Sequence, residues 1–111
     1  MNFIEKRATI TKRVEERINN LLKEPQSEDE WVGDGTLYRF TVTFDDGHFM
    51  DISVCGVSYY EDGGCNSAWT QAVLYDKNGA ELCYSDVGED FFGYWALDDG
   101  NNTYVAILEK E

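Results

Sequence analysis

The side chains with the most chemical potential in this chain are one histidine and three cysteines. His48 and Cys55 are a possible base and nucleophile, but no neighbouring group in the sequence orients them. Together with Cys65 and Cys83 they also make a possible Cys₃His zinc set. The cysteines are separated by ten and eighteen positions, without the close Cys-x₂-Cys pair typical of structural zinc sites. We therefore expect no enzyme, no metal and no cofactor, and three reduced thiols.

The acidic side chains are the other chemical signal, and they are unevenly distributed along the chain. The formal net charge is −13, from 22 acidic and 9 basic residues. Residues 1–24 contain six bases against four acids, a balance of +2, whereas residues 25–111 contain three bases against eighteen acids, a balance of −15. A negative charge of this size repels phosphates and attracts basic surfaces. We therefore expect a basic protein partner and no direct binding of nucleic acid.

Hydrophobic periodicity predicts the first secondary-structure element of the chain, a helix that precedes the acidic region. Residues 3–23 are predicted to form one amphipathic helix, because apolar residues recur at steps of seven, four, four and three. Asn2 would cap this helix and Pro25 would prevent its continuation. The apolar stripe consists of Phe3, Ile10, Val14, Ile18 and Leu21.

From residue 36 onward the hydrophobic period is two, which predicts strands. Aspartate- and glycine-containing turns at 45–47, 76–79 and 98–102 separate several of them. The predicted strands span about 38–44, 50–54, 69–75, 81–85, 91–97 and 103–108. We thus expect an α+β domain over residues 1–111, with a helix at 3–23, an acidic loop at 24–35 and an antiparallel sheet at 36–109. In this architecture the N-terminal helix packs on a five- to six-stranded meander.

Composition and hydropathy bear on where the protein acts. The chain is 42% hydrophobic and 14% aromatic, which favours a packed core over disorder. The sequence contains neither an apolar stretch of about 18 residues, as a membrane span needs, nor the apolar segment of a signal peptide. We therefore expect a cytoplasmic protein without a membrane partner, either a monomer or a dimer.

Acids beside predicted hairpin tips or on strands are the candidate partner-binding residues. They are Asp45, Asp46, Asp51, Glu61, Asp62, Asp86, Glu89 and Asp90, with Tyr59 and Tyr60 as candidate aromatic anchors. Residues i and i+2 on one strand face are about 6.6–6.8 Å apart, a spacing comparable to that of phosphates along one nucleic-acid strand. Carboxylates arranged in this way can occupy the phosphate positions of a nucleic-acid-binding protein.

A small chain with one basic helix and an intensely acidic sheet resembles the small phage-encoded inhibitors of the anti-CRISPR type that act as DNA mimics. The resemblance covers the whole chain as charge, size and layout, without a shared motif. It implies a non-enzymatic inhibitor that occupies a nucleic-acid channel of an RNA-guided CRISPR nuclease complex in a bacterial cell. Two alternatives stay open: an immunity or antitoxin protein that neutralises a basic toxin, and an acidic housekeeping domain whose charge serves only solubility.

Overall fold

A computed structural model describes residues 2–23, 33–58, 67–85 and 90–111. Within these ranges the chain forms seven strands and one helix. The elements are β1 (Asn2–Ile10), α1 (Lys12–Lys23), β2 (Gly33–Thr43), β3 (Phe49–Ser58), β4 (Ser67–Tyr75), β5 (Glu81–Ser85), β6 (Gly93–Asp98) and β7 (Asn102–Lys110).

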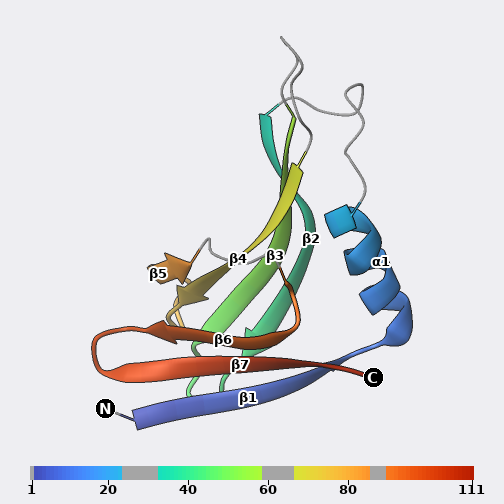
Figure 1. The fold of residues 1–111 in the computed structure, drawn as a ribbon. Helices are drawn as coiled ribbons and strands as arrows, with labels where there is room; N and C mark the ends of the chain where they lie inside the picture. Colours follow the sequence, from blue (N-terminus) through green and yellow to red (C-terminus); the bar gives the residue numbers. More distant parts are fainter. Residues whose placement is uncertain (1, 24–32, 59–66, 86–89) are drawn as a thin grey trace.

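The described strands form two sheets. The larger sheet is an antiparallel meander in the order β2-β3-β4-β5, and the smaller sheet has the order β1-β7-β6. In the smaller sheet β6 runs antiparallel to β7, whereas β1 runs parallel to it. Figure 1 shows β1, β6 and β7 crossing the lower part of the larger sheet, with α1 beside its upper part. One face of the larger sheet is therefore covered by the smaller sheet and by the helix.

The core lies between these layers and draws on both sheets and the helix. The larger sheet contributes Met50, Ile52, Val54 and Leu74, the smaller sheet contributes Trp95, Leu97, Tyr104 and Leu108, and α1 contributes Ile18. The Trp95 indole nitrogen also donates a hydrogen bond of 2.9 Å to the Phe91 carbonyl oxygen. This bond satisfies the polar atom of a buried ring.

The predicted single meander of five or six strands is wrong. The predicted turns at 45–47, 76–79 and 98–102 do connect hairpins, but the β6–β7 hairpin belongs to a separate sheet. Alternation of apolar and polar residues identifies strands and tight hairpins, yet it does not say which hairpins share a sheet. Here the two sheets pack against each other and bury their apolar faces. The described part of the protein is therefore mostly β, with one short helix, and not one helix packed on a single sheet.

The predicted helix over residues 3–23 is also wrong in its first half. Residues 2–10 form β1, which pairs with β7 from Asn2↔Asn102 to Ile10↔Lys110. The partly buried Ile4 and Ala8 and the buried Ile10 have the period of two that a strand needs, whereas Phe3 of the predicted stripe is 67% exposed. Pairing with β7 outweighs local helix propensity, as tertiary context often does.

The helix begins at Lys12 because two side chains satisfy its first amides. The Val14 amide donates to Thr11 Oγ1 at 3.4 Å, and the Lys12 amide donates to Glu111 Oε2 at 3.1 Å. Thr11 therefore replaces Asn2 as the cap, and a carboxylate from the end of the chain lies at the positive end of the helix dipole. The predicted acidic loop at 24–35 lies outside the described residues up to 32, and Gly33 already begins β2.

Candidate functional site

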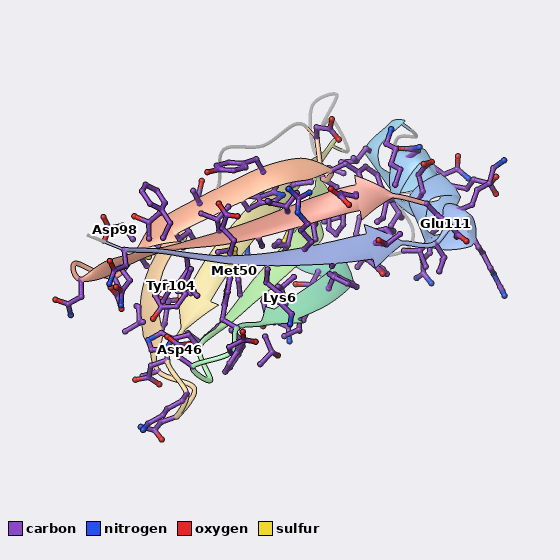
Figure 2. The ribbon with its side chains drawn as sticks, turned by 90° about the horizontal axis from the view of Figure 1, so that it is seen from below. Lys6, Asp46, Met50, Asp98, Tyr104 and Glu111 are labelled. Atoms are coloured by element: carbon purple, nitrogen blue, oxygen red, sulfur yellow. The ribbon has the colours of Figure 1, made fainter. Side chains whose placement is uncertain are left out.

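Three hairpin turns meet at one end of the molecule and bring acidic side chains together. The Tyr104 hydroxyl donates to Asp46 Oδ2 at 2.6 Å, which joins the β2–β3 turn to β7. The β4–β5 turn lies against the same place, because a Cβ atom added at Gly47 would be 3.0 Å from Lys77 Cβ. We call the five carboxylates of these turns the acidic turn cluster: Asp45, Asp46, Asp76, Asp98 and Asp99. Figure 2 shows Asp46 and Asp98 far from Glu111, which lies beside α1.

Backbone amides of the turns orient several of these carboxylates. Asp76 Oδ1 accepts hydrogen bonds from the Asn78 and Ala80 amides at 2.8 and 2.9 Å. Asp99 Oδ1 accepts from two amides of its own turn at 2.8 and 2.9 Å, and Asp98 Oδ1 accepts from the Gly100 amide at 2.6 Å. Aspartate is favoured in such turns because its short side chain reaches the backbone two residues ahead. The carboxylates are therefore positioned before any partner arrives.

The hydrogen bonds of Asp76 and Asp99 also lower the pKa values of these two carboxyl groups. Hydrogen bonds from the Ala80 and Asn78 amides hold the pKa of Asp76 below its ordinary value of 3.8. Hydrogen bonds from the Asn102 and Asn101 amides lower the pKa of Asp99 in the same way. An amide donor stabilises the charged form of a carboxyl group and not the protonated form. Asp76 and Asp99 consequently keep their negative charges further into the acid range than free carboxyl groups do.

Asp46, His48, Asp99 and Tyr104 form the joint between the two sheets at this end. The His48 ring stacks on Tyr104, with ring centres 4.6 Å apart and planes inclined by 15°. His48 Nδ1 lies 3.2 Å from Asp46 Oδ1 without making a hydrogen bond, and Nε2 lies 3.7 Å from Asp99 Oδ2. The His48 side chain is only 20% exposed, although it belongs to a hairpin turn. It contacts both sheets and helps to hold the turns together.

The Asp46–Tyr104 bond changes the pKa values of both groups. Partial burial works against ionisation of Asp46, but hydrogen bonds from the Tyr104 hydroxyl and the His48 amide outweigh it and lower the Asp46 pKa. Burial, followed by the hydrogen bond to Asp46, raises the pKa of Tyr104 from 10.0 to about 12. The bond therefore joins an ionised carboxylate to a neutral phenol over the whole physiological range.

The cysteines are not arranged as the sequence hypotheses required. His48 and Cys55 lie seven positions apart along the β3 direction, a separation of roughly 23 Å at about 3.3 Å per residue, so they cannot act as base and nucleophile. The Cys55 thiol instead lies 3.6 Å from the Ser53 hydroxyl. Cys83 donates to the Asp98 carbonyl oxygen at 3.1 Å, and burial raises the pKa of its thiol.

In the part of the chain that the structure describes, no group of three or more His, Cys, Asp or Glu side chains is arranged to hold a metal ion. Cys65 of the possible zinc set lies outside the described residues.

The predicted partner-binding residues separate into three groups. Asp45 and Asp46 belong to the acidic turn cluster. Asp51 lies on the outer side of β3, where it accepts a hydrogen bond of 2.6 Å from Thr41, and Asp90 accepts one of 3.1 Å from the Phe92 amide at the opposite end of β6 from Asp98. Glu61, Asp62, Asp86, Glu89, Tyr59 and Tyr60 lie outside the described residues.

Sequence reasoning missed three members of the cluster, Asp76, Asp98 and Asp99. Their positions in Asp- and Gly-containing turns identified them as turn residues, which they are. The turn motif itself is the signal that could have found them, because each of the predicted turns at 45–47, 76–79 and 98–102 contains at least one aspartate. Their convergence depends on packing of the β6–β7 hairpin against the larger sheet, which no local pattern shows.

The acidic turn cluster is only partly neutralised by nearby cations. Lys6 Nζ lies 3.6 Å from Asp45 Oδ1, but the Asp45 side chain is 95% exposed. Lys77 is exposed in the β4–β5 turn. An ion pair between exposed side chains is weak and screened by salt, so the charge of Asp45 is directed into solvent. Asp99, whose side chain is 11% exposed, contributes to the charge of the cluster from beneath its surface.

Across the described residues, the helix is too short and too polar to cross a membrane.

The chain was also compared with known proteins. No protein-family model matches the chain, and neither a curated protein nor a solved structure was found to match it.

Proposed function

We propose that this protein is a non-enzymatic inhibitor whose acidic turn cluster binds a basic, nucleic-acid-binding groove of a protein partner. The expected target is an RNA-guided CRISPR nuclease complex in the cytoplasm of a bacterial cell, and the carboxylates take the positions of DNA phosphates. The observation that carries the proposal is the convergence of five carboxylates from three separate turns at one end of the fold.

The carboxylates of the cluster share two physical properties with phosphates. Three of them, Asp46, Asp76 and Asp99, stay ionised at neutral and mildly acidic pH, because turn amides or neighbouring donors lower their pKa values. Free acceptor positions also remain, since a carboxylate has about four lone-pair sites and the turn amides and the Tyr104 hydroxyl occupy one or two of them on Asp46, Asp76 and Asp98. The Asp45 side chain is 95% exposed. Arginine or lysine side chains of a groove can therefore bind without displacing the hydrogen bonds of the turns.

Preorganisation and long-range attraction both favour such a complex. Side chains already held by their turns lose little conformational entropy when a partner binds. A net charge of −13 steers the protein toward basic surfaces, and this steering weakens as salt screens it over about 8–10 Å. We therefore expect fast, salt-sensitive association and competition with the nucleic acid that the groove normally holds.

The experiment is displacement of labelled target DNA from an RNA-guided nuclease complex by the wild type and by two charge-reversal variants. Asp45→Lys reverses one exposed charge of the cluster, and Glu16→Lys makes the same change on an exposed position of α1. We expect Asp45→Lys to weaken displacement by about tenfold or more, because like charges would face each other in the groove. Glu16→Lys should displace DNA as the wild type does.

Three outcomes would contradict parts of the proposal. If DNA stays bound while cleavage stops, groove occupation is wrong and inhibition acts elsewhere. If Asp45→Lys and Glu16→Lys weaken displacement equally, net charge rather than the cluster is responsible. If no nuclease complex is bound but a basic toxin is, the immunity-protein alternative replaces this target.

A further inference from the structure

The larger sheet has an outer face with an aromatic patch that does not belong to the core. Along β3 and β4, Met50, Ile52 and Leu74 point into the core, so the residues between them point outward. The outward residues at the turn end and on β5 are only partly buried, and two are well exposed: Tyr84 is 65% and Leu82 is 40% exposed. We call Phe49, Val73, Tyr75, Leu82 and Tyr84 the aromatic patch.

The aromatic patch begins where the acidic turn cluster ends. Phe49 directly follows His48 of the β2–β3 turn, and Tyr75 directly precedes Asp76 of the β4–β5 turn. Phe49 and Tyr75 are register partners, and their rings stack with centres 5.0 Å apart and planes inclined by 16°. On the next row of the face, Tyr84 pairs with Val73. The aromatic rings of Phe49 and Tyr75 therefore lie at the same end of the larger sheet as the carboxylates of the two turns that they adjoin.

We infer that the aromatic patch receives an arginine side chain of the basic partner, beside the cations that the acidic turn cluster binds. The guanidinium group is planar and weakly hydrated, so it can stack on an aromatic ring while it forms hydrogen bonds with a carboxylate. Its aliphatic stem can cover apolar atoms such as those of Val73 and Leu82. Lysine, with a compact and strongly hydrated ammonium group, fits such a surface less well. This inference rests on the proposed function.

The same face already holds one guanidinium from the chain itself. Arg39 Nε lies 3.8 Å from Asp51 Oδ2, although the Arg39 side chain is 61% exposed. Arg39 lies on β2 and Asp51 on β3. On the outer face, the pair that contains Asp51 follows that of Phe49, and the pair of Arg39 with Ser53 comes next.

The charge at the edge of the patch also decides between occupants. The carboxylates beside it attract an arginine, whereas they repel a nucleic-acid strand and a second copy of a chain with a net charge of −13.

The chain offers a matched control on its other sheet. Tyr94 is 63% exposed, close to the 65% of Tyr84. In the smaller sheet Tyr94 of β6 pairs with Ile107 of β7, and Ile107 pairs in turn with Arg7 of β1. The surroundings of Tyr94 therefore include a cation of the chain itself. Tyr84→Ala and Tyr94→Ala remove similar exposed rings, and only the first removes a ring of the aromatic patch.

The test measures binding of two synthetic peptides, an arginine–glycine repeat and a lysine–glycine repeat of equal length and charge, by fluorescence anisotropy. We expect the wild type to bind the arginine peptide more tightly. Tyr84→Ala should weaken arginine-peptide binding by about fivefold, as expected for loss of an exposed cation–π contact, and should leave lysine-peptide binding nearly unchanged. Tyr84→Phe should restore the preference, and Tyr94→Ala should keep it. Amide resonances of residues 49, 75 and 84 should shift only with the arginine peptide.

Each remaining outcome overturns one specific claim. If Tyr84→Ala and Tyr94→Ala behave alike, the arginine inference fails, whereas the proposed function survives if Asp45→Lys still loses displacement of DNA. If Asp45→Lys displaces DNA normally but Tyr84→Ala loses the arginine preference, the proposed function fails and the patch alone binds arginine. If the wild type is a dimer and Tyr84→Ala is a monomer, the patch binds a second copy of the chain and the inference is overturned. If single-stranded DNA shifts the resonances of the patch, the patch binds nucleic acid and the inference is likewise overturned.

Discussion

The two ends of the molecule are held by different forces. At the helix end, Ile18 is completely buried among apolar side chains, while the neighbouring charges of Lys12 and Arg13 lie in solvent. At the turn end the joints are polar, with Tyr104 bonded to Asp46 and stacked on His48. Apolar packing docks the helix, with the Glu111 carboxylate at its first amides, whereas the turn end fixes several carboxylates in place and depends on their charge. Stability and function are thus expected to respond to different changes.

The largest expected effect is at the helix end. Ile18→Ala should lower the free energy of unfolding by about 2–5 kcal/mol, because it removes buried methyl groups and leaves a cavity. Denaturant unfolding measures this, with exposed Arg13→Ala as the control, for which we expect a change within about 0.5 kcal/mol. An unchanged unfolding midpoint for Ile18→Ala would mean that α1 is not docked on the core.

A smaller effect is expected at the turn end. Tyr104→Phe removes the hydroxyl that donates to Asp46 but keeps the ring that stacks on His48. Because the acceptor is charged but partly exposed, we expect a loss of about 1–2 kcal/mol. Coupling to Asp46→Ala in a double-mutant cycle measures the bond itself. Additive losses from the two substitutions would show that the bond contributes nothing.

The shifted pKa values at the turn end predict how stability depends on pH. The lowered pKa values of Asp46, Asp76 and Asp99 contribute stability that is present above about pH 4 and is lost as pH falls through the lowered values. The raised pKa of Tyr104 contributes stability that is present below pH 10 and is lost as pH rises from 10 to about 12. Unfolding free energies measured across these windows test both signs.

Two variants separate the ends in this pH experiment. Ile18→Ala should shift the whole stability profile downward without changing its shape. Tyr104→Phe should remove part of the loss above pH 10, because its ring cannot ionise. A Tyr104→Phe profile that keeps the full alkaline loss would assign that loss to other groups.

The smallest expected effect is that of the exposed ion pair beside the cluster. Lys6→Ala should change the unfolding free energy by less than about 1 kcal/mol, because both side chains of the Lys6–Asp45 pair are largely exposed. The same variant should bind a basic partner slightly more tightly, since it uncovers Asp45. Weaker binding would show that Lys6 itself contacts the partner.

Parts of the fold could be predicted from the sequence, and the reasons for failure are physical. The turns at 45–47, 76–79 and 98–102 were predicted because aspartate and glycine there have specific backbone roles, and Gly47, Gly79 and Gly100 do adopt positive φ. The N-terminal strand was missed because Ile10, Val14 and Ile18 fit a helical stripe. Only pairing with β7, about a hundred positions away, identifies residues 2–10 as a strand.

The candidate site was predicted in part for the same reason. Asp45 and Asp46 were identified because a local turn motif exposes them. The inclusion of Asp76 and Asp99 depends on which hairpins meet, and the position of His48 depends on stacking across two sheets. These are tertiary contacts, and the sequence pattern of each hairpin is silent about them.

The parallel pairing of β1 with β7 has a consequence for how the chain folds. The β2–β3 and β4–β5 hairpins close over a few residues, whereas β1 must find a partner about a hundred positions away. The entropy cost of closing a loop rises with its length, and contacts between distant positions slow folding. We therefore expect the hairpins to form early and β1 to dock late, after β6 and β7 have paired. The acidic turn cluster would then assemble before the N-terminal strand adds Lys6 beside it.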